Sequence, residues 1–136
     1  MPPIPGEHLY SIAEYQALLA GAHPSAHGPI LVRDLPESQL LATVRRLALA
    51  HGWLFYHTHR SDRSDEGFPD CTLTKPGRLI FAELKSQRGK VTIAQQRWLL
   101  LLRQSVPGIE VYCWRPSDLQ AITATLTHAR SREDSP

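Results

Sequence analysis

The sequence predicts an α/β fold, with a mixed central sheet of about four strands flanked by helices. From residue 36 onward, the hydrophobic pattern follows the order helix, three strands, helix, strand, helix. The predicted strands are short and rich in aromatic or β-branched residues, and turn residues separate them. The chain has 136 residues, of which 42% are apolar, so we expect one domain with a buried core.

Turn and capping residues bound the predicted elements. Glu37–His51 has apolar residues at helical spacing, with Pro36 at its start and Gly52 as its stop. Trp53–His59 is rich in aromatic side chains and predicts the first strand. Lys75–Gly77 is a tight turn between the second and third strands. We expect the other strands at Phe68–Thr74, Arg78–Lys85 and Ile109–Trp114, and the other helices at Thr92–Gln104 and, capped by Ser117, up to Leu126.

Composition divides the chain into three parts. Residues 1–35 are rich in Pro, Gly and His and predict an N-terminal appendage. Residues 36–127 contain the periodic patterns described above and predict the folded domain. Residues 128–136 are charged and poor in apolar side chains, so we expect a disordered tail.

Composition also argues against a membrane protein or an exported protein. No apolar run approaches the roughly 20 residues that span a bilayer, and the first residues lack the features of a signal peptide. The two cysteines have no paired spacing, which favours a reduced, cytoplasmic protein; nucleoid association and a phage origin both stay open. The net charge of +2 is too small to indicate a polyanion partner.

One stretch of the sequence has charges of a single sign. Between Lys85 and Ile109 there are five cations and no Asp or Glu. Such a stretch can attract a phosphate backbone, and an ordinary solvated face explains it equally well.

Segment 67–85 has the side chains best suited to chemistry. Side chains alternate between the faces of a strand, so Glu83 and Lys85 share one face and Leu84 points to the other. The preceding strand pairs with this one across the tight turn, which places Asp70 near the same end of the hairpin. We therefore expect Asp70, Glu83 and Lys85 to meet. The alternative is a hairpin with a structural salt bridge between Lys85 and one carboxylate.

Two carboxylates this close stay ionised together most easily when a cation lies between them. Carboxylate oxygens suit Mg²⁺ or Mn²⁺, and we expect Asp70 and Glu83 to bind such a metal together with the backbone carbonyl of Leu84. The metal would activate a water for attack on a phosphodiester. Lys85 would orient this water or stabilise the transition state.

These residues resemble the signature of the PD-(D/E)XK nucleases, and more narrowly that of the VRR-NUC family within this superfamily. Pro69–Asp70 resembles the PD, and Glu83–Lys85 resembles the (D/E)XK. Gly67 opens a similar G-x-P-D, Thr92–Gln95 is similar to the T-x-x-Q of the family, and Glu37 opens the first helix. The resemblance covers roughly residues 36–126, with the elements in the same order.

The resemblance implies a restriction-endonuclease-like core of order αβββαβ and metal-dependent cleavage of DNA. It also implies a structure-selective endonuclease that is similar to Holliday junction resolvases and acts on branched DNA as a homodimer. Glu37 would be a further metal ligand and Gln95 a catalytic residue beside Lys85. Each has a simpler explanation, because Glu37 suits the dipole of a first helical turn and Gln95 can form a capping box with Thr92.

Four further residues are candidates for contact with DNA. Arg88 and Lys90 directly follow the third strand, His57 lies in the first strand, and Arg60 lies in the loop after it. The simpler explanation is a solvated loop for Arg60 and a strand-filling side chain for His57. We expect Trp98 in the core rather than as a platform for a base.

Two other functions stay open: a non-catalytic DNA-binding module of the same fold, and a nuclease subunit that depends on a partner. The first would typically lose a carboxylate or the lysine, and all three are present. No sequence feature selects between endonuclease and exonuclease action, or between DNA and RNA.

Overall fold

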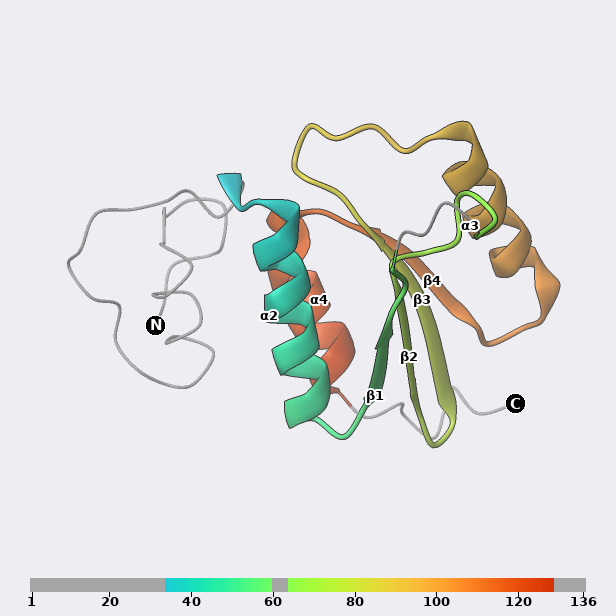
Figure 1. The fold of residues 1–136 in the computed structure, drawn as a ribbon. Helices are drawn as coiled ribbons and strands as arrows, with labels where there is room; N and C mark the ends of the chain where they lie inside the picture. The colour runs from blue at the N-terminus through green and yellow to red at the C-terminus, as the bar shows by residue number, and fades with distance from the viewer. Residues whose placement is uncertain (1–33, 60–63, 129–136) are drawn as a thin grey trace.

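The computed structural model describes residues 34–59 and 64–128, and its centre is a four-stranded sheet (Figure 1). The strands are β1 (Leu54–His57), β2 (Cys71–Lys75), β3 (Arg78–Leu84) and β4 (Glu110–Trp114), in this order across the sheet. The pairs β1–β2 and β2–β3 are antiparallel, whereas β3 and β4 are parallel and are joined through α3 (Ile93–Ser105). The predicted α/β class with a mixed sheet of four strands is confirmed.

Helices cover both faces of the sheet. α2 (Glu37–Ala50) and α4 (Leu119–Thr127) lie side by side on one face, and α3 lies on the other (Figure 1). Ile80, Ala82 and Leu84 of β3 are buried in the core on the side of α2 and α4. Because side chains alternate along a strand, Glu83 points to the side of α3.

The core between the sheet and these two helices is apolar and continuous. Its helical residues include Leu40, Val44, Leu47, Ile122 and Leu126. Removing each such side chain from water contributes about 1.5–3 kcal/mol. Trp53 Nε1 donates a hydrogen bond to the Leu126 carbonyl oxygen at 2.9 Å, which fixes the end of α4 beside the residue that precedes β1.

Each strand is shorter than predicted. β2 begins at Cys71 rather than Phe68, and β3 ends at Leu84 rather than Lys85. Asp70 therefore lies in the loop directly before β2, and Lys85 lies directly after β3. The two residues flank the sheet at the same end, and each keeps one backbone hydrogen bond to a neighbouring strand or its extension, Asp70 O from Thr58 N–H and Lys85 N–H to Trp114 O.

The helix ends test the predicted caps. The capping box of α3 is confirmed: Thr92 Oγ1 accepts from the Gln95 N–H at 3.2 Å, and Gln95 Oε1 accepts from the Thr92 N–H at 2.9 Å. The predicted Ser117 cap of the last helix is wrong. Pro116–Asp118 forms a short 3-10 turn, in which the Asp118 carboxylate accepts from the Arg115 N–H at 2.8 Å. A proline suits the first position of such a turn because its φ is already helical.

Most of the predicted appendage and tail lies in residues 1–33 and 129–136, outside the described residues, and so does Arg60. In the part of the chain that the structure describes, no helix combines the length and apolar character needed to cross a bilayer.

Candidate active site

Glu83, near the end of β3, is the centre of the candidate site. It is 1% exposed, and two other buried polar residues, Lys85 and Gln95, lie around it. Gln95 Nε2 donates to Glu83 Oε1 at 3.0 Å, and Lys85 Nζ lies 3.8 Å from the same oxygen. The structure thus brings together a glutamate and a lysine from one face of the hairpin and a glutamine from the first turn of α3.

Asp70 forms a second side of the site. Continuing the β2–β3 register by one residue places it opposite Glu83. Its Oδ2 accepts from the Leu84 N–H at 2.9 Å, and its backbone carbonyl accepts from the Thr58 N–H at 2.8 Å. These two hydrogen bonds fix Asp70 between the ends of β1 and β3, beside the Glu83 carboxylate.

The surroundings of Glu83 disfavour its charged form. Burial, followed by the neighbouring Asp70, raises the pKa of Glu83 from 4.5 to about 8, although the charge of Lys85 acts in the opposite direction. The second oxygen, Oε2, is buried and has no hydrogen-bond partner among the residues described. A buried carboxylate oxygen without a partner is costly unless a proton or a cation reaches it.

We expect the metal-free protein to lose stability as the pH rises from 4.5 to about 8. Across this window the folded state keeps a proton on Glu83 and the unfolded state does not, so the free energy of unfolding falls with pH. Thermal unfolding in EDTA, followed by circular dichroism, would measure the slope. Glu83→Gln is the control because it keeps the shape and cannot ionise, and its slope should be flatter. Equal slopes for both proteins would contradict the raised pKa.

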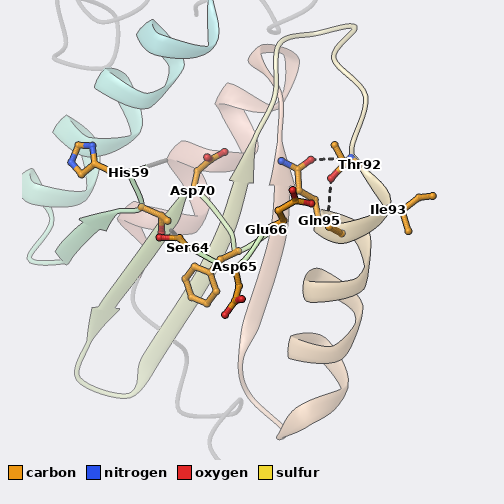
Figure 2. A pocket seen from close by; sticks show the side chains of 12 residues that line it. His59, Ser64, Asp65, Glu66, Asp70, Thr92, Ile93 and Gln95 are labelled. Atoms are coloured by element: carbon orange, nitrogen blue, oxygen red, sulfur yellow. Dashed lines mark hydrogen bonds between the residues drawn. The ribbon is translucent and has the colours of Figure 1, made fainter. Parts of the chain in front are cut away.

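A cavity of about 760 Å³ opens between the loop before β2 and the first turn of α3 (Figure 2). Figure 2 shows Asp70 and Gln95 on different walls of this cavity, one from the loop and the other from the helix. Two more carboxylates, Asp65 and Glu66, and the side chain of His59 also line it. The cavity connects the Asp70 side of the site to solvent, and its several carboxylates make it favourable for a cation.

Gly67 sets how closely the loop approaches α3. Its φ is +92°, and a Cβ at this position would lie 2.5 Å from the Ala94 carbonyl carbon and 2.8 Å from the Gln95 backbone nitrogen. Because these atoms are backbone atoms of a helix, they cannot move aside as a flexible side chain would. Only glycine fits here, and the close approach brings Asp70 and Gln95 to the same cavity.

A smaller cavity, of about 270 Å³, also borders Asp70 and lies at the first turn of α2. Glu37, His57 and Leu84 help to line it. Across residues 34–59 and 64–128, no three His, Cys, Asp or Glu side chains gather closely enough to hold a metal ion. The structure therefore brings Asp70 and Glu83 together and leaves Glu37, which is exposed, at a neighbouring cavity.

The candidate DNA-binding residues lie in different surroundings. Arg88 and Lys90 are exposed on the turn that follows Lys85, and His57 is half-buried at the smaller cavity. The candidate Arg60 lies outside the described residues. Of the five cations between residues 85 and 109, Lys85 alone is buried, so four of them are exposed to solvent.

Arg115, which no sequence pattern singled out, fixes this turn. Its Nη1 donates to the carbonyl oxygens of Ser86, Gln87 and Gly89 at 2.8, 3.3 and 2.6 Å. Hydrogen bonds from one charged guanidinium to three carbonyls hold the turn in a single conformation directly after Lys85. These hydrogen bonds join residues that are 26 to 29 positions apart in the chain. The residues next to Arg115 in the sequence therefore do not predict them.

A scan against protein-family models, a search of curated proteins and a search of solved structures all gave no match. The chemistry of the site is therefore the basis on which a function can be assigned.

Proposed function

We propose that this protein is a metal-dependent nuclease that hydrolyses the phosphodiester bonds of DNA. The observation that carries the proposal is the buried Glu83 carboxylate, which has an unpartnered Oε2 among the described residues and lies beside Asp70. A stable core does not require two adjacent carboxylates and a buried ammonium group, and replacing such groups with apolar ones often stabilises a protein. A divalent cation would neutralise the two carboxylates.

The donor atoms suit Mg²⁺ or Mn²⁺. Asp70 and Glu83 offer carboxylate oxygens, and we assign the backbone carbonyl of Leu84 as the third oxygen. Mg²⁺ commonly binds through one or two protein carboxylates and completes its shell with waters and substrate phosphates, so three ionisable side chains are not required. When bound, the cation would supply a water of lowered pKa and neutralise charge that develops at the phosphate.

Lys85 would stabilise the reacting phosphate. Lys85 is 7% exposed, and its Nζ lies 3.8 Å from Glu83 Oε1. The ammonium group is therefore held beside the carboxylates rather than in bulk water. In a desolvated position, a fixed ammonium group stabilises negative charge on phosphate oxygens or holds the attacking water more effectively than in solution.

Gln95 would position Glu83. The oxygen and the nitrogen of its side-chain amide have different partners. The amide oxygen closes the capping box with the Thr92 N–H, and the amide nitrogen donates to Glu83 Oε1. The capping box is therefore formed, and the bond to Glu83 supports the proposed role of Gln95 in the site. Occupation of Oε1 leaves Oε2 as the oxygen that needs another partner.

The proposal extends to fold, substrate and assembly. The order α2, β1, β2, β3, α3, β4 is the order expected of a restriction-endonuclease-like core. The exposed Arg88 and Lys90 would contact the phosphate backbone of the DNA. His57 would contact the DNA at the site, and Arg60 is a further candidate that rests on the sequence alone. A symmetric homodimer acting on branched DNA would supply two sites for the cleavage of two strands.

The test is cleavage of labelled linear duplex, single strand, flap, nicked duplex and four-way junction in Mg²⁺ or Mn²⁺, with EDTA as the blank. We expect metal-dependent cleavage that is lost in Asp70→Asn. Asp65→Asn is the matched control, since Asp65 lines the same cavity and is not part of the proposed metal site.

Each outcome has a distinct meaning. Paired symmetric cuts in the junction would support a dimeric, resolvase-like enzyme, whereas cleavage of flaps would keep the chemistry and replace the substrate. Binding of DNA with no cleavage in either metal would contradict the nuclease proposal, and it would favour a binding module or a subunit that needs a partner.

A further inference from the structure

An apolar hollow of about 590 Å³ lies along α3. The side chains of Ile93, Trp98 and Leu101 form much of its lining, with Arg97 also at its surface. Ile93 is 85% exposed, Leu101 is 54% exposed and Trp98 is 36% exposed. A group of exposed apolar side chains around a hollow marks a binding surface more often than an isolated apolar residue does.

The wall formed by Trp98 is fixed. Its Nε1 donates to the Glu66 carbonyl oxygen at 3.1 Å, and its ring packs edge-on against Phe68 with 5.1 Å between the ring centroids. The expectation that Trp98 belongs to the core is therefore corrected, because this hydrogen bond holds the ring at the surface of the hollow. The hollow is preformed, so a ligand would not have to order its wall.

The hollow adjoins the cavity beside Asp70. Glu66, Ile93 and Ala94 line both of them. Figure 2 shows Glu66 and Ile93 at the first turn of α3, on either side of the helix start. Trp98 follows Ala94 by about one helical turn, which is about 5.4 Å along the axis. A strand bound at Asp70 would therefore pass the start of α3, where the hollow begins.

We infer that the hollow binds an unpaired nucleobase of the DNA strand that is cleaved, so that the substrate is single-stranded next to the scissile phosphate. This inference rests on the proposed nuclease function and narrows its substrate. A paired duplex offers phosphates, sugars and the edges of its bases, whereas an apolar surface suits the flat face of an unstacked base. Arg97 also lines the hollow, and its guanidinium would pair with the phosphate of that nucleotide.

A second copy of the chain is the competing occupant of the hollow. Two features favour the nucleotide over it. The hollow adjoins the cavity that Asp70 and Gln95 line, and the cation Arg97 is among its own lining residues. An interface between copies of the chain would need neither feature.

The test measures binding to oligonucleotides that carry 2-aminopurine, a fluorescent base, in Ca²⁺ to limit cleavage. One DNA is a flap with the probe unpaired beside the branch, and the other is a matched full duplex. Leu101→Ser removes apolar surface from the hollow, and Ile93→Ser does so at a second exposed position. Leu100→Ser is the control, since Leu100 is 50% exposed on the same helix and does not line the hollow.

We expect Leu101→Ser and Ile93→Ser each to weaken flap binding by about tenfold, with duplex binding unchanged and a smaller change in probe fluorescence. Leu100→Ser should bind like the wild type. Unchanged flap affinity in both hollow variants, or an equal loss for flap and duplex, would overturn the inference. A sedimentation shift from dimer to monomer in Leu101→Ser would overturn it as well, in favour of a second copy.

Cleavage of the same DNAs by the wild type in Mg²⁺ separates the two proposals. If the wild type cleaves and the hollow variants bind the flap normally, the base site alone is rejected. If the wild type cleaves no DNA, the nuclease proposal is rejected whatever the probe reports.

Discussion

Replacing Lys85 by methionine is expected to lower kcat for DNA cleavage by about 10²–10³-fold, the usual effect of removing one preorganised group that stabilises transition-state charge. Methionine keeps an unbranched side chain in the buried position and removes only the ammonium group near Glu83 Oε1. Single-turnover cleavage of the best DNA from the substrate panel, in Mg²⁺, would measure the change.

The matched control is Arg88→Met, which removes an exposed cation three residues further along the chain. It should weaken DNA binding and reduce its dependence on salt while leaving single-turnover cleavage at saturation nearly unchanged. Circular dichroism should show that Lys85→Met is folded. Cleavage by Lys85→Met at the wild-type rate would reject the assignment of Lys85 to the reaction and leave it as the structural partner of Glu83.

The second large effect is expected from Gly67→Ala, with Gly77→Ala as its control. Both glycines have positive φ, +92° and +79°, so alanine costs roughly 1 kcal/mol in backbone strain at either position. At Gly77 the new Cβ would meet no atom within 4 Å, whereas at Gly67 it would overlap the backbone of α3 at Ala94. We expect Gly67→Ala to be less stable than Gly77→Ala by about 2 kcal/mol or more.

Urea unfolding and cleavage assays would measure both consequences. A shift of the loop away from α3 would separate Asp70 from Gln95, so Gly67→Ala should also lose cleavage under conditions where it is still folded. Gly77→Ala should cleave normally, because Gly77 lies in the turn at the far end of the hairpin. Equal stability and activity of the two variants would show that the loop does not need its close contact with α3.

The order of helices and strands could be predicted because it follows from local patterns. The helical spacing of Leu40, Val44 and Leu47 and the alternation of Ala82, Glu83 and Leu84 are present in short windows of sequence. The ends of the strands are predicted less accurately. Asp70 belongs to the predicted second strand, yet β2 begins at Cys71, and the Asp70 side chain accepts a hydrogen bond from the Leu84 N–H. Local preference does not show where a ladder stops.

The candidate site could be predicted only in part, for a related reason. That Glu83 and Lys85 share a face follows from strand geometry. Gln95 is a candidate through the resemblance to the family's T-x-x-Q, whereas its position after Thr92 predicts only a capping box. The burial of Glu83 and the isolation of its Oε2 depend on how α3 packs against the sheet. No short window of sequence contains this information, and the same holds for the carbonyls bound by Arg115.

The guanidinium of Arg115 also makes the site part of a larger unit of folding. The residue is fixed to the start of the last helix through its backbone bond to Asp118, while its side chain closes the turn after Lys85. The far end of that helix is tied to Trp53, beside β1. Fraying of α4 would therefore release the turn after Lys85 as well, so amide exchange at Gly89 should follow the protection of this helix rather than that of an ordinary surface turn. The stability of the candidate site would then depend on α4 as well as on the sheet.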